Sequence, residues 1–360
     1  MNVSKLLDIE PYSLGGADKE KILSTYLTFL SRHHYACCEP FRKMMDGIGF
    51  DPDKDYPSYN LPFLPVQLFK KLELCSVPKE EIIKTLTSSG TSHQLRSHIF
   101  LDKECAANQI KVLAKIVSSF IGTKRAPMII VDAESVVKNR DLLSANDTGI
   151  SGFSLFGSKR MFALNDKMEL NIEHLEEFIA IHKGEHIFMF GFTFKIYQYF
   201  YKALRKAGIK PDLSNAVLIH GGGWKKLESE SVSPKEFRKS LNDVCGIRLV
   251  HDYYGMVEQT GTIYMECEQG QYHTSVFSDI IIRRPYDFSV ATVGEEGIIQ
   301  VLSILPTSYP GHSLLSDDKG ILLGIDDCPC GRLGNYFKII GRLENTEIRG
   351  CSDTYEEMVN

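Results

Sequence analysis

The sequence has 360 residues, of which 43% are hydrophobic and 24% charged, and a net charge of −5. This composition is that of a globular protein long enough for two or three subdomains around a cleft. The negative charge argues against nucleic acid or an anionic membrane as a partner. No signal peptide is recognisable and no apolar run reaches the ~20 residues of a spanning helix, so we expect a cytoplasmic protein without a membrane span.

The first 60 residues are expected to form helices. Apolar residues recur at helical spacing in KEKILSTYLTFLSRHHYACCEPFRKMMDGIG, and the pattern stops at Gly47 and Gly49. The next segment, YPSYNLPFLPVQLFKKLEL, is rich in proline and aromatic residues, which predicts a chain packed in extended form over a core.

An α/β pattern starts at Thr85. APMIIVDAES predicts a buried central strand, NAVLIHGGGWKK a strand ending in glycines, and GIRLVHDYYGMVEQTG a strand entering a loop. The stretch NIEHLEEFIAIHKGEHIFMFGFTFKIYQYFYKALRKAG predicts helix, turn, strand and helix, and residues 271–345 are rich in strand patterns. The fold class is therefore α/β with a β-rich subdomain, although the order of the strands cannot be read.

Three loops of this region carry groups that could hold a nucleotide. TLTSSGTS is rich in hydroxyls around Gly90, which suits either a phosphate cradle or a mobile surface turn, and no Walker pattern follows. HGGGWKK lets a flat ligand approach the backbone or makes a tight turn. In HDYYGMVEQTG, a tyrosine beside a glycine can form one wall for a nucleobase, and Glu258 can hold Mg²⁺.

Two later stretches add charged groups. SLLSDDKG places two aspartates before a glycine turn, where a carboxylate could accept from both ribose hydroxyls. IIGRLENTEIRGC supplies arginines that could contact ribose or phosphate. For each stretch alone, a charged hairpin end is the simpler interpretation.

The nine cysteines are an odd number, and disulfides are not expected in a reducing compartment. Five of them lie in apolar or helical context and are interpreted as buried fillers: Cys37, Cys38, Cys75, Cys105 and Cys245. MECEQGQYH and CPCGR instead offer three cysteines and a histidine, which is a closed tetrahedral set for a structural zinc ion: Cys267, His273, Cys328 and Cys330. The alternative is two unrelated pairs of buried residues.

The ordered set TSSGTS, YYGMVEQTG, SDDKG and GRLENTEIRG resembles the adenylate-forming enzymes. LPFLPVQLFK, SYPGHSLLSDDKG and RGCSDT resemble more closely the acyl-protein synthetase family typified by the LuxE component of bacterial luminescence. The resemblance extends from about Leu61 to Thr354, and the related phenylacetate–CoA ligases share parts of it.

The resemblance implies an ATP-dependent ligase. A carboxylic acid, expected to be a fatty acid, would form an acyl-adenylate with release of pyrophosphate, and a thiol would then take the acyl group and release AMP. Glu258 would hold Mg²⁺, Asp318 (or Asp317) would bind ribose, and Arg342 would contact ribose or phosphate. Phosphate would be held by Thr87, Ser88, Ser89, Gly90, Thr91 and Ser92, and adenine by Gly221, Gly222, Gly223, Tyr254 and Gly255.

The sequence departs from the family pattern at three places. Arg96 stands near the position of a usual phosphate-loop lysine, and Val257 replaces a frequent threonine, for which Gln259 could compensate. The mobile C-terminal lysine domain of ~100 residues, about one small domain, is not expected here. The family passes the acyl group to a C-terminal cysteine, and Cys351, beside Arg349, fits that role because a nearby cation favours the thiolate.

The expected organisation has four segments and leaves three functions open. The segments are an N-terminal region (1–84), an adenylating core (85–265), a β-rich subdomain with the zinc set (266–345) and a tail with Cys351 (346–360). The expected partner is an acyl-accepting reductase or carrier protein. The alternatives are a ligase for coenzyme A or a carrier, and a non-catalytic nucleotide-binding subunit; the oligomeric state stays open.

Overall fold

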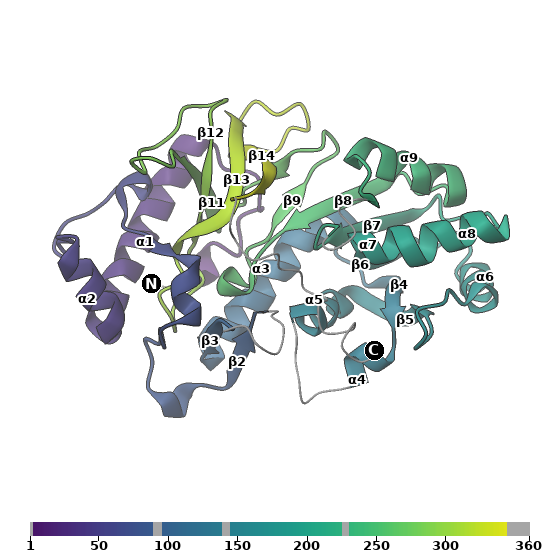
Figure 1. Ribbon diagram of the computed structural model, residues 1–360, viewed down its shortest axis with the longest axis horizontal. Coiled ribbons are helices and arrows are strands. Elements are labelled where there is room, and N and C mark those ends of the chain that lie inside the picture. The colour runs from purple at the N-terminus through teal and green to yellow at the C-terminus, as the bar shows by residue number, and fades with distance from the viewer. Residues whose placement is uncertain (1–2, 89–95, 139–144, 225–229, 344–360) are drawn as a thin grey trace. The chain divides into compact units, whose positions relative to one another are not determined.

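The structure, a computed structural model, describes residues 3–88, 96–138, 145–224 and 230–343 (Figure 1). The chain divides into two compact units. Among the described residues, unit 1 comprises those in 3–119 and 255–343, and unit 2 comprises those in 120–254. The division of the sequence into four segments stays a prediction.

Unit 1 combines N-terminal helices with antiparallel strands. Its α-helices are α1 (Gly16–Cys37), α2 (Glu39–Gly47) and α3 (Lys103–Ile121), the last of which ends just inside unit 2. Its 3₁₀ helices are η1 (Val3–Lys5), η2 (Ser58–Asn60), η3 (Val66–Lys70), η4 (Lys79–Glu81) and η8 (Val257–Gln259). Its strands are β1 (Leu64–Pro65), β2 (Lys84–Thr87), β3 (His98–Leu101), β9 (Tyr264–Glu266), β10 (Tyr272–His273), β11 (Ser278–Arg283), β12 (Glu296–Ser303), β13 (Ser313–Ile325) and β14 (Asn335–Arg342).

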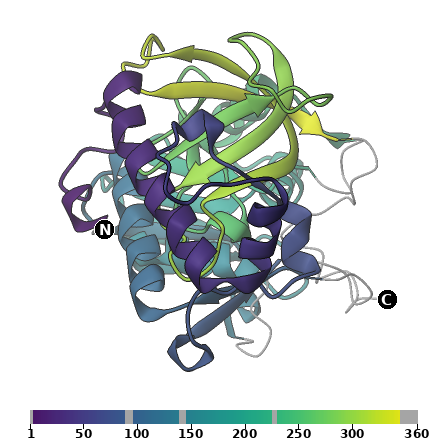
Figure 2. The same ribbon diagram turned by 90° about the vertical axis from the view of Figure 1, so that its left-hand side faces the viewer.

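The strands of unit 1 run in the order β11-β12-β13-β14-β10-β9, with antiparallel pairing throughout. Strand β1 adds in parallel to β13, and β2 and β3 form a separate hairpin. Helix α1, purple in Figure 2, lies in front of these strands and is tied to them by a hydrogen bond between Ser31 Oγ and His312 Nε2 of 2.8 Å. The predicted N-terminal helices are therefore confirmed, whereas the proline-rich segment forms short 3₁₀ turns and β1 rather than a continuous extended chain.

Unit 2 is a parallel sheet with helices. Its strands are β4 (Ala126–Ala133), β5 (Gly157–Leu164), β6 (Ile187–Phe192), β7 (Ala216–Gly221) and β8 (Leu249–Tyr254), in the order β8-β7-β6-β4-β5. Its helices are α4 (Ser135–Lys138), α5 (Ala145–Phe153), η5 (Ser154–Phe156), α6 (Ile172–Ile181), α7 (Thr193–Lys195), a π-helix η6 (Ile196–Tyr201), α8 (Lys202–Ala207) and α9 (Pro234–Cys245). Every residue of β4, β6 and β7 is buried, as expected for parallel strands covered on both faces.

Local sequence signals explain where these helices begin and end. Ser233 caps α9 by accepting from the backbone N–H of Glu236, Pro234 occupies the first turn, and Gly246 ends the helix with φ 78°. The apolar faces of α6, α8 and α9 share one core with the sheet, which includes Leu175, Leu204 and Leu241. Within the described residues, no helix is long and apolar enough to cross a membrane.

Candidate nucleotide site and metal centre

Glu258 is the most deeply buried of the acidic residues predicted to bind ligand. It lies on η8, directly after the YYG motif, and only 4% of it is exposed. Burial raises the pKa of Glu258, a hydrogen bond from Ser97 lowers it, and the charge of Asp317 raises it further. Arg342 lowers the pKa of Glu258. The charges of Asp317 and Arg342 thus act on the Glu258 carboxylate in opposite directions.

Strand pairing places the aspartates of SLLSDDKG beside Arg342. Asp318 on β13 faces Arg342 on β14, and Asp318 Oδ1 accepts from Arg342 Nε over 3.3 Å. The Asp317 carboxylate accepts from Gln67 Nε2, and its carbonyl oxygen accepts from the N–H of Leu343 over 2.9 Å. The two aspartates therefore have different environments, and Asp318 pairs with Arg342.

The base of the hydroxyl-rich loop closes beside Glu258. Ser88 follows β2 and Ser97 precedes β3, and the two are linked in both directions. The N–H of Ser97 donates to Ser88 Oγ over 2.9 Å, and the N–H of Ser88 donates to the Ser97 carbonyl over 3.3 Å. Thr87, the last residue of β2, pairs with His98. The predicted loop residues Ser89, Gly90, Thr91 and Ser92 lie outside the described residues, as does Cys351.

Gln259 does not take the place of the missing threonine at Val257. The Gln259 side chain is 1% exposed, and its Nε2 donates to the carbonyl oxygens of Val301 and Gly311 over 3.1 and 2.8 Å. A Cβ at Gly311 would lie 2.8 Å from the carbonyl oxygen of Glu258, so this glycine allows close approach of the two backbones. Gln259 therefore fixes the backbone that carries Glu258, because its amide donors point into the core.

In unit 2, the glycine run follows the end of β7 as predicted. A Cβ at Gly221 would lie 2.5 Å from the Tyr253 ring, and one at Gly222 would lie 2.9 Å from Phe192. Gly222 and Gly223 also have φ of 80° and 62°, a region that favours glycine. The Tyr253 ring thus covers Gly221, while Tyr254 ends β8 in a half-buried position and Gly255 follows it.

Polar side chains lie next to the backbone of this glycine run. Thr193 Oγ1 donates to the carbonyl of Gly221 over 3.1 Å and lies 2.9 Å from His220 Nδ1. His220 Nδ1 lies 3.6 Å from Asp252 Oδ1 on the neighbouring strand. Lys195, two residues after Thr193, forms a buried ion pair with Asp132, and the N–O distances are 2.7 and 2.8 Å.

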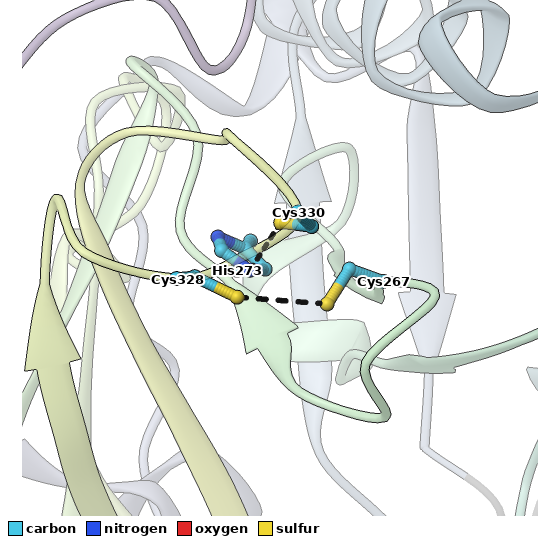
Figure 3. Close-up of side chains that lie close together, drawn as sticks. All are labelled: Cys267, His273, Cys328 and Cys330. Atoms are coloured by element: carbon cyan, nitrogen blue, oxygen red, sulfur yellow. Dashed lines mark hydrogen bonds between the residues drawn. The ribbon is translucent and has the colours of Figure 1, made fainter.

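The predicted zinc residues come together at one end of the antiparallel strands of unit 1 (Figure 3). Cys267 directly follows β9 and His273 ends β10, and these two strands form a hairpin. Cys328 and Cys330 lie in the turn between β13 and β14. Because β14 pairs with β10, this turn lies against the hairpin. The potential ligand atoms all lie within 4.8 Å of one another, and three of the four residues are buried.

The distances suit a tetrahedral ion. Zinc–sulfur bonds of about 2.3 Å place two sulfur ligands about 3.8 Å apart and a sulfur and a nitrogen ligand about 3.6 Å apart. Here Cys267 Sγ and Cys328 Sγ are 4.0 Å apart, and Cys330 Sγ and His273 Nε2 are 3.3 Å apart. A disulfide would need an S–S distance of about 2.05 Å. These side chains point toward a common centre, as Figure 3 shows.

Burial has opposite consequences for the histidine and for the cysteines of this cluster. Burial lowers the pKa of His273 to about 4, so its imidazole is neutral at pH 7 and can donate a lone pair. Burial raises the pKa of Cys267 to about 12, and the N–H of Gln269, which donates to Cys267 Sγ over 3.4 Å, opposes this rise. Of the cysteines interpreted as fillers, Cys38, Cys105 and Cys245 are buried, Cys75 is half-buried and Cys37 is exposed, so Cys37 corrects that interpretation.

Sequence reasoning missed several residues that shape these sites. Ser97, Gln67 and Thr193 each touch a predicted ligand group through a hydrogen bond described above. Gln67 lies in the LPFLPVQLFK stretch, which the resemblance had already singled out. Ser97 and Thr193 carry no local signal, because their positions follow from strand pairing.

Comparison with known proteins agrees with this architecture. A family model described as acyl-protein synthetase, LuxE, matches residues 2–360. The chain is 25% identical over 308 residues to the long-chain-fatty-acid–luciferin-component ligase of Aliivibrio fischeri, covering 81% of this chain and 77% of that protein.

Solved structures of 2-hydroxyisobutyryl-CoA ligase share the fold. The complex with 2-HIB-AMP in the postadenylation state gives a TM-score of 0.69 at 16% identity and covers 92% of this chain and 69% of that one. An open conformation with 2-HIB-AMP and CoA gives 0.70 at 16% identity and covers 93% and 77%. The predicted fold class, that of an adenylate-forming ligase, is confirmed. Because the family model spans almost the whole sequence, the chain belongs to the LuxE acyl-protein synthetases, AMP-forming ligases that use ATP to activate an acid and pass the acyl group to a protein thiol.

Proposed function

We propose that this chain activates a long-chain fatty acid and transfers the acyl group to Cys351, from which a partner reductase or carrier protein takes it. The substrate class is that named for the Aliivibrio fischeri relative. The observation that carries the proposed site is the buried Glu258 carboxylate, which lies near a second carboxylate, Asp317, and Arg342.

In the first step, a carboxylate oxygen of the fatty acid attacks the α-phosphorus of ATP. The new O–P bond forms as the α,β-phosphoanhydride bond breaks, and pyrophosphate leaves with the bonding electrons. Glu258 holds Mg²⁺, which when bound offsets the charge of the phosphates. Asp318 accepts from the ribose hydroxyls, and Arg342, which it orients, donates to ribose or phosphate.

The resemblance to adenylate-forming enzymes assigns adenine to the glycine-rich loop and phosphate to the hydroxyl-rich loop. Gly221, Gly222 and Gly223 allow the adenine to approach the backbone, and Tyr254 stacks on it. The hydroxyls from Thr87 to Ser92 and the glycine backbone of that loop donate to the phosphates.

In the second step, the Cys351 thiolate attacks the acyl carbon. The C–S bond forms, the C–O bond to AMP breaks, AMP leaves with the electron pair, and the thiol proton passes to solvent. Arg349 favours the thiolate. The acyl thioester then moves to a thiol of the partner by the same exchange.

Replacing Glu258 tests the metal-binding role. We expect Glu258→Gln to lower fatty-acid-dependent pyrophosphate exchange by about 100-fold or more, since the amide removes the charge that a divalent ion needs. Glu296→Gln, a change at an exposed carboxylate of the same unit, serves as the control. An unchanged exchange rate in Glu258→Gln would show that another group holds the ion.

Replacing Cys351 tests the acceptor. After incubation with labelled fatty acid, ATP and Mg²⁺, Cys351→Ser should carry no hydroxylamine-sensitive label and should keep pyrophosphate exchange. Cys37→Ser, which removes an exposed cysteine, should keep both. Label that persists in Cys351→Ser assigns the thioester to another residue, and label that appears only on added coenzyme A identifies a CoA ligase instead.

We further propose that Cys267, His273, Cys328 and Cys330 bind one zinc ion in a closed, structural site. The convergence of the four ligand atoms supports this, and the set leaves no position for substrate. We expect about one zinc per chain by elemental analysis after purification without added metal. Cobalt(II) should give the d–d and thiolate charge-transfer absorption of a tetrahedral site; octahedral spectra would contradict this ligand set.

A further inference from the structure

The N-terminal segment, residues 10–19, is attached to the two loops that carry the proposed zinc ligands. Its backbone pairs with both sides. The N–H of Leu333 donates to the carbonyl of Tyr12 over 3.0 Å, and the N–H of Val276 donates to the carbonyl of Pro11 over 2.8 Å. Leu333 follows the Cys328–Cys330 turn, and Val276 follows His273. The segment therefore bridges chain stretches that a metal ion would also join.

Asp326, two residues before Cys328, caps helix α1. Its carboxylate oxygens accept from the N–H of Gly16, the first residue of α1, over 2.9 and 3.1 Å, and Oδ1 also accepts from the N–H of Gly334 over 2.7 Å. The residue at the N-cap position, Gly15, has no side chain to do this. A carboxylate from 310 residues away thus satisfies the helix end, where negative charge is favourable.

The ligand turn holds this cap in an unusual backbone conformation. Asp326 has φ 65°, and Gly331 and Gly334 have φ 80° and 92°. For a residue with a side chain, the left-handed region costs conformational energy, although Asp tolerates it better than most. The turn has no helix or strand between β13 and β14. Two backbone hydrogen bonds close the turn, from the N–H of Asp326 to the carbonyl of Gly334 over 3.1 Å and from the N–H of Gly331 to the carbonyl of Cys328 over 3.0 Å, and a metal ion on Cys328 and Cys330 would add a tie to the neighbouring hairpin.

The Tyr12 side chain of the segment also contacts residues next to the proposed metal site. The Tyr12 ring meets the His273 ring edge-on with centroids 6.2 Å apart, and the Arg332 guanidinium lies 5.8 Å from the Tyr12 ring centroid. Arg332 is itself fixed by Glu268, with N–O distances of 2.6 and 3.2 Å. Because three thiolates and a neutral imidazole around Zn²⁺ carry a net charge of about −1, Arg332 stands where a compensating charge is needed.

Lys19 also attaches the N-terminal segment, residues 10–19, to the strands around the proposed metal site. The side chain is 1% exposed; its Nζ donates to Thr274 Oγ1 and lies 3.3 Å from Asp279 Oδ2. Thr274 is the residue after the ligand His273. Asn335 Nδ2 donates to the other Asp279 oxygen over 2.8 Å. A buried lysine is stable only while these partners stay in place.

We infer that the metal centre is a latch for the N-terminus: zinc bound by Cys267, His273, Cys328 and Cys330 fixes the 326–334 turn, and this turn holds residues 10–19 and the start of α1. The inference rests on the proposed zinc site. Zinc joins the β9–β10 hairpin to the turn, and the turn then presents Asp326 to the helix end, Leu333 to Tyr12 and Arg332 to the Tyr12 ring. Loss of the metal releases these contacts together.

Hydrogen–deuterium exchange of the full chain, with zinc and after chelation, tests the latch. Chelation should speed exchange about tenfold or more in residues 10–20 and 326–334, which would become a local opening unit. Exchange should stay unchanged in α9, and in the second half of α1, where Ser31 and His34 provide separate anchors to the strands. Retained protection of residues 10–20 in a zinc-free, folded chain overturns the latch and leaves the zinc site standing.

Variants of Asp326 keep the test decisive if chelation unfolds the chain. Asp326→Gly suits the positive φ and removes the carboxylate, so we expect unchanged zinc content and faster exchange limited to residues 13–20 and the amide of Gly334, which also donates to this carboxylate. Asp326→Asn keeps one acceptor oxygen and should have a smaller effect. Asp18→Asn removes an exposed charge in the first turn of α1 and is the control for a general charge effect. If Asp326→Gly leaves that exchange unchanged, the latch is wrong; a chain that binds no zinc refutes the metal site itself.

Discussion

A single added methyl group at Gly221 should disturb the glycine run after β7. Its Cβ would lie 2.5 Å from the Tyr253 ring, and that ring is packed against Phe153 with centroids 5.1 Å apart, so it cannot move away freely. We expect Gly221→Ala to lower the free energy of unfolding by about 1–3 kcal/mol, as overpacking does, and to weaken ATP binding. Urea denaturation and nucleotide titration measure both effects.

Gly47→Ala is the matched control, because a Cβ there meets nothing within 4 Å. Its effect on unfolding should stay within about 0.5 kcal/mol. Equal stability of the Gly221 and Gly47 variants would contradict the close packing of Tyr253 over Gly221.

The buried pair Lys195–Asp132 gives a second prediction for single residues. Both side chains are about 1–2% exposed, and the ammonium lies 2.7 Å from one carboxylate oxygen. Lys195→Met leaves Asp132 buried without that charge and should cost about 3–5 kcal/mol of unfolding free energy. Adding Asp132→Leu should recover much of the loss. A double variant as unstable as the sum of the single variants would contradict this coupling.

At the scale of elements, helix α1 is attached to the rest of unit 1 through two buried, neutral histidines, His34 and His312. Burial lowers the pKa of His312 to about 3, and burial lowers that of His34 well below its usual value, with further lowering from His312 and His33. His34 Nδ1 lies 2.7 Å from Ser76 Oγ, and its Nε2 lies 2.9 Å from the carbonyl of Pro306. The two rings stack with centroids 5.0 Å apart. Protonation would place charge inside this contact.

These histidines predict acid sensitivity. A histidine with a depressed folded pKa contributes stability that is complete above its unfolded pKa of about 6.5 and is lost as the pH falls toward the folded pKa. For His312, the window runs from about pH 6.5 down to about pH 3. The free energy of unfolding should fall by about 2 kcal/mol between pH 7 and pH 5 from this residue.

Urea denaturation across this pH range provides the measurement. His312→Gln should flatten the slope, because the amide does not titrate, whereas His174→Gln, at an exposed site on α6, should leave it unchanged. A wild-type stability independent of pH from 7 to 5 would contradict neutral buried histidines.

At the scale of the whole molecule, the sequence predicted what depends on local pattern. The mostly apolar runs of β4 and β6 and the helical spacing of α1 predicted the observed elements correctly, because burial on two faces or on one face leaves a recognisable pattern of apolar residues. The grouping of Cys267, His273, Cys328 and Cys330 was also predictable, because two short motifs supply four potential metal ligands. The order of the strands could not be predicted from the sequence. Only the observed pairing shows that β10 lies beside β14, which brings the two motifs together.

The features missed from the sequence join distant parts of the chain. Gln259 looked like a donor for phosphate, yet its amide donates to Val301 and Gly311, carbonyls 42 and 52 residues away. Nothing in the sequence around Asp326 indicated that its side chain caps the start of α1. The paired carboxylates were visible, but the depth at which Glu258 is buried follows from tertiary packing alone. The periodicity of apolar residues shows which face of a helix or strand is buried, but it does not identify the residues that pack against that face.

The most direct test of the account is carboxylate-dependent exchange of pyrophosphate into ATP with Mg²⁺ present, measured across fatty and aromatic acids. Family membership and the site around Glu258 predict exchange with long-chain fatty acids and its loss in Glu258→Gln. Absence of exchange with every acid, with and without a partner reductase and despite measurable ATP binding, would contradict acyl activation by this chain and favour a non-catalytic nucleotide-binding subunit.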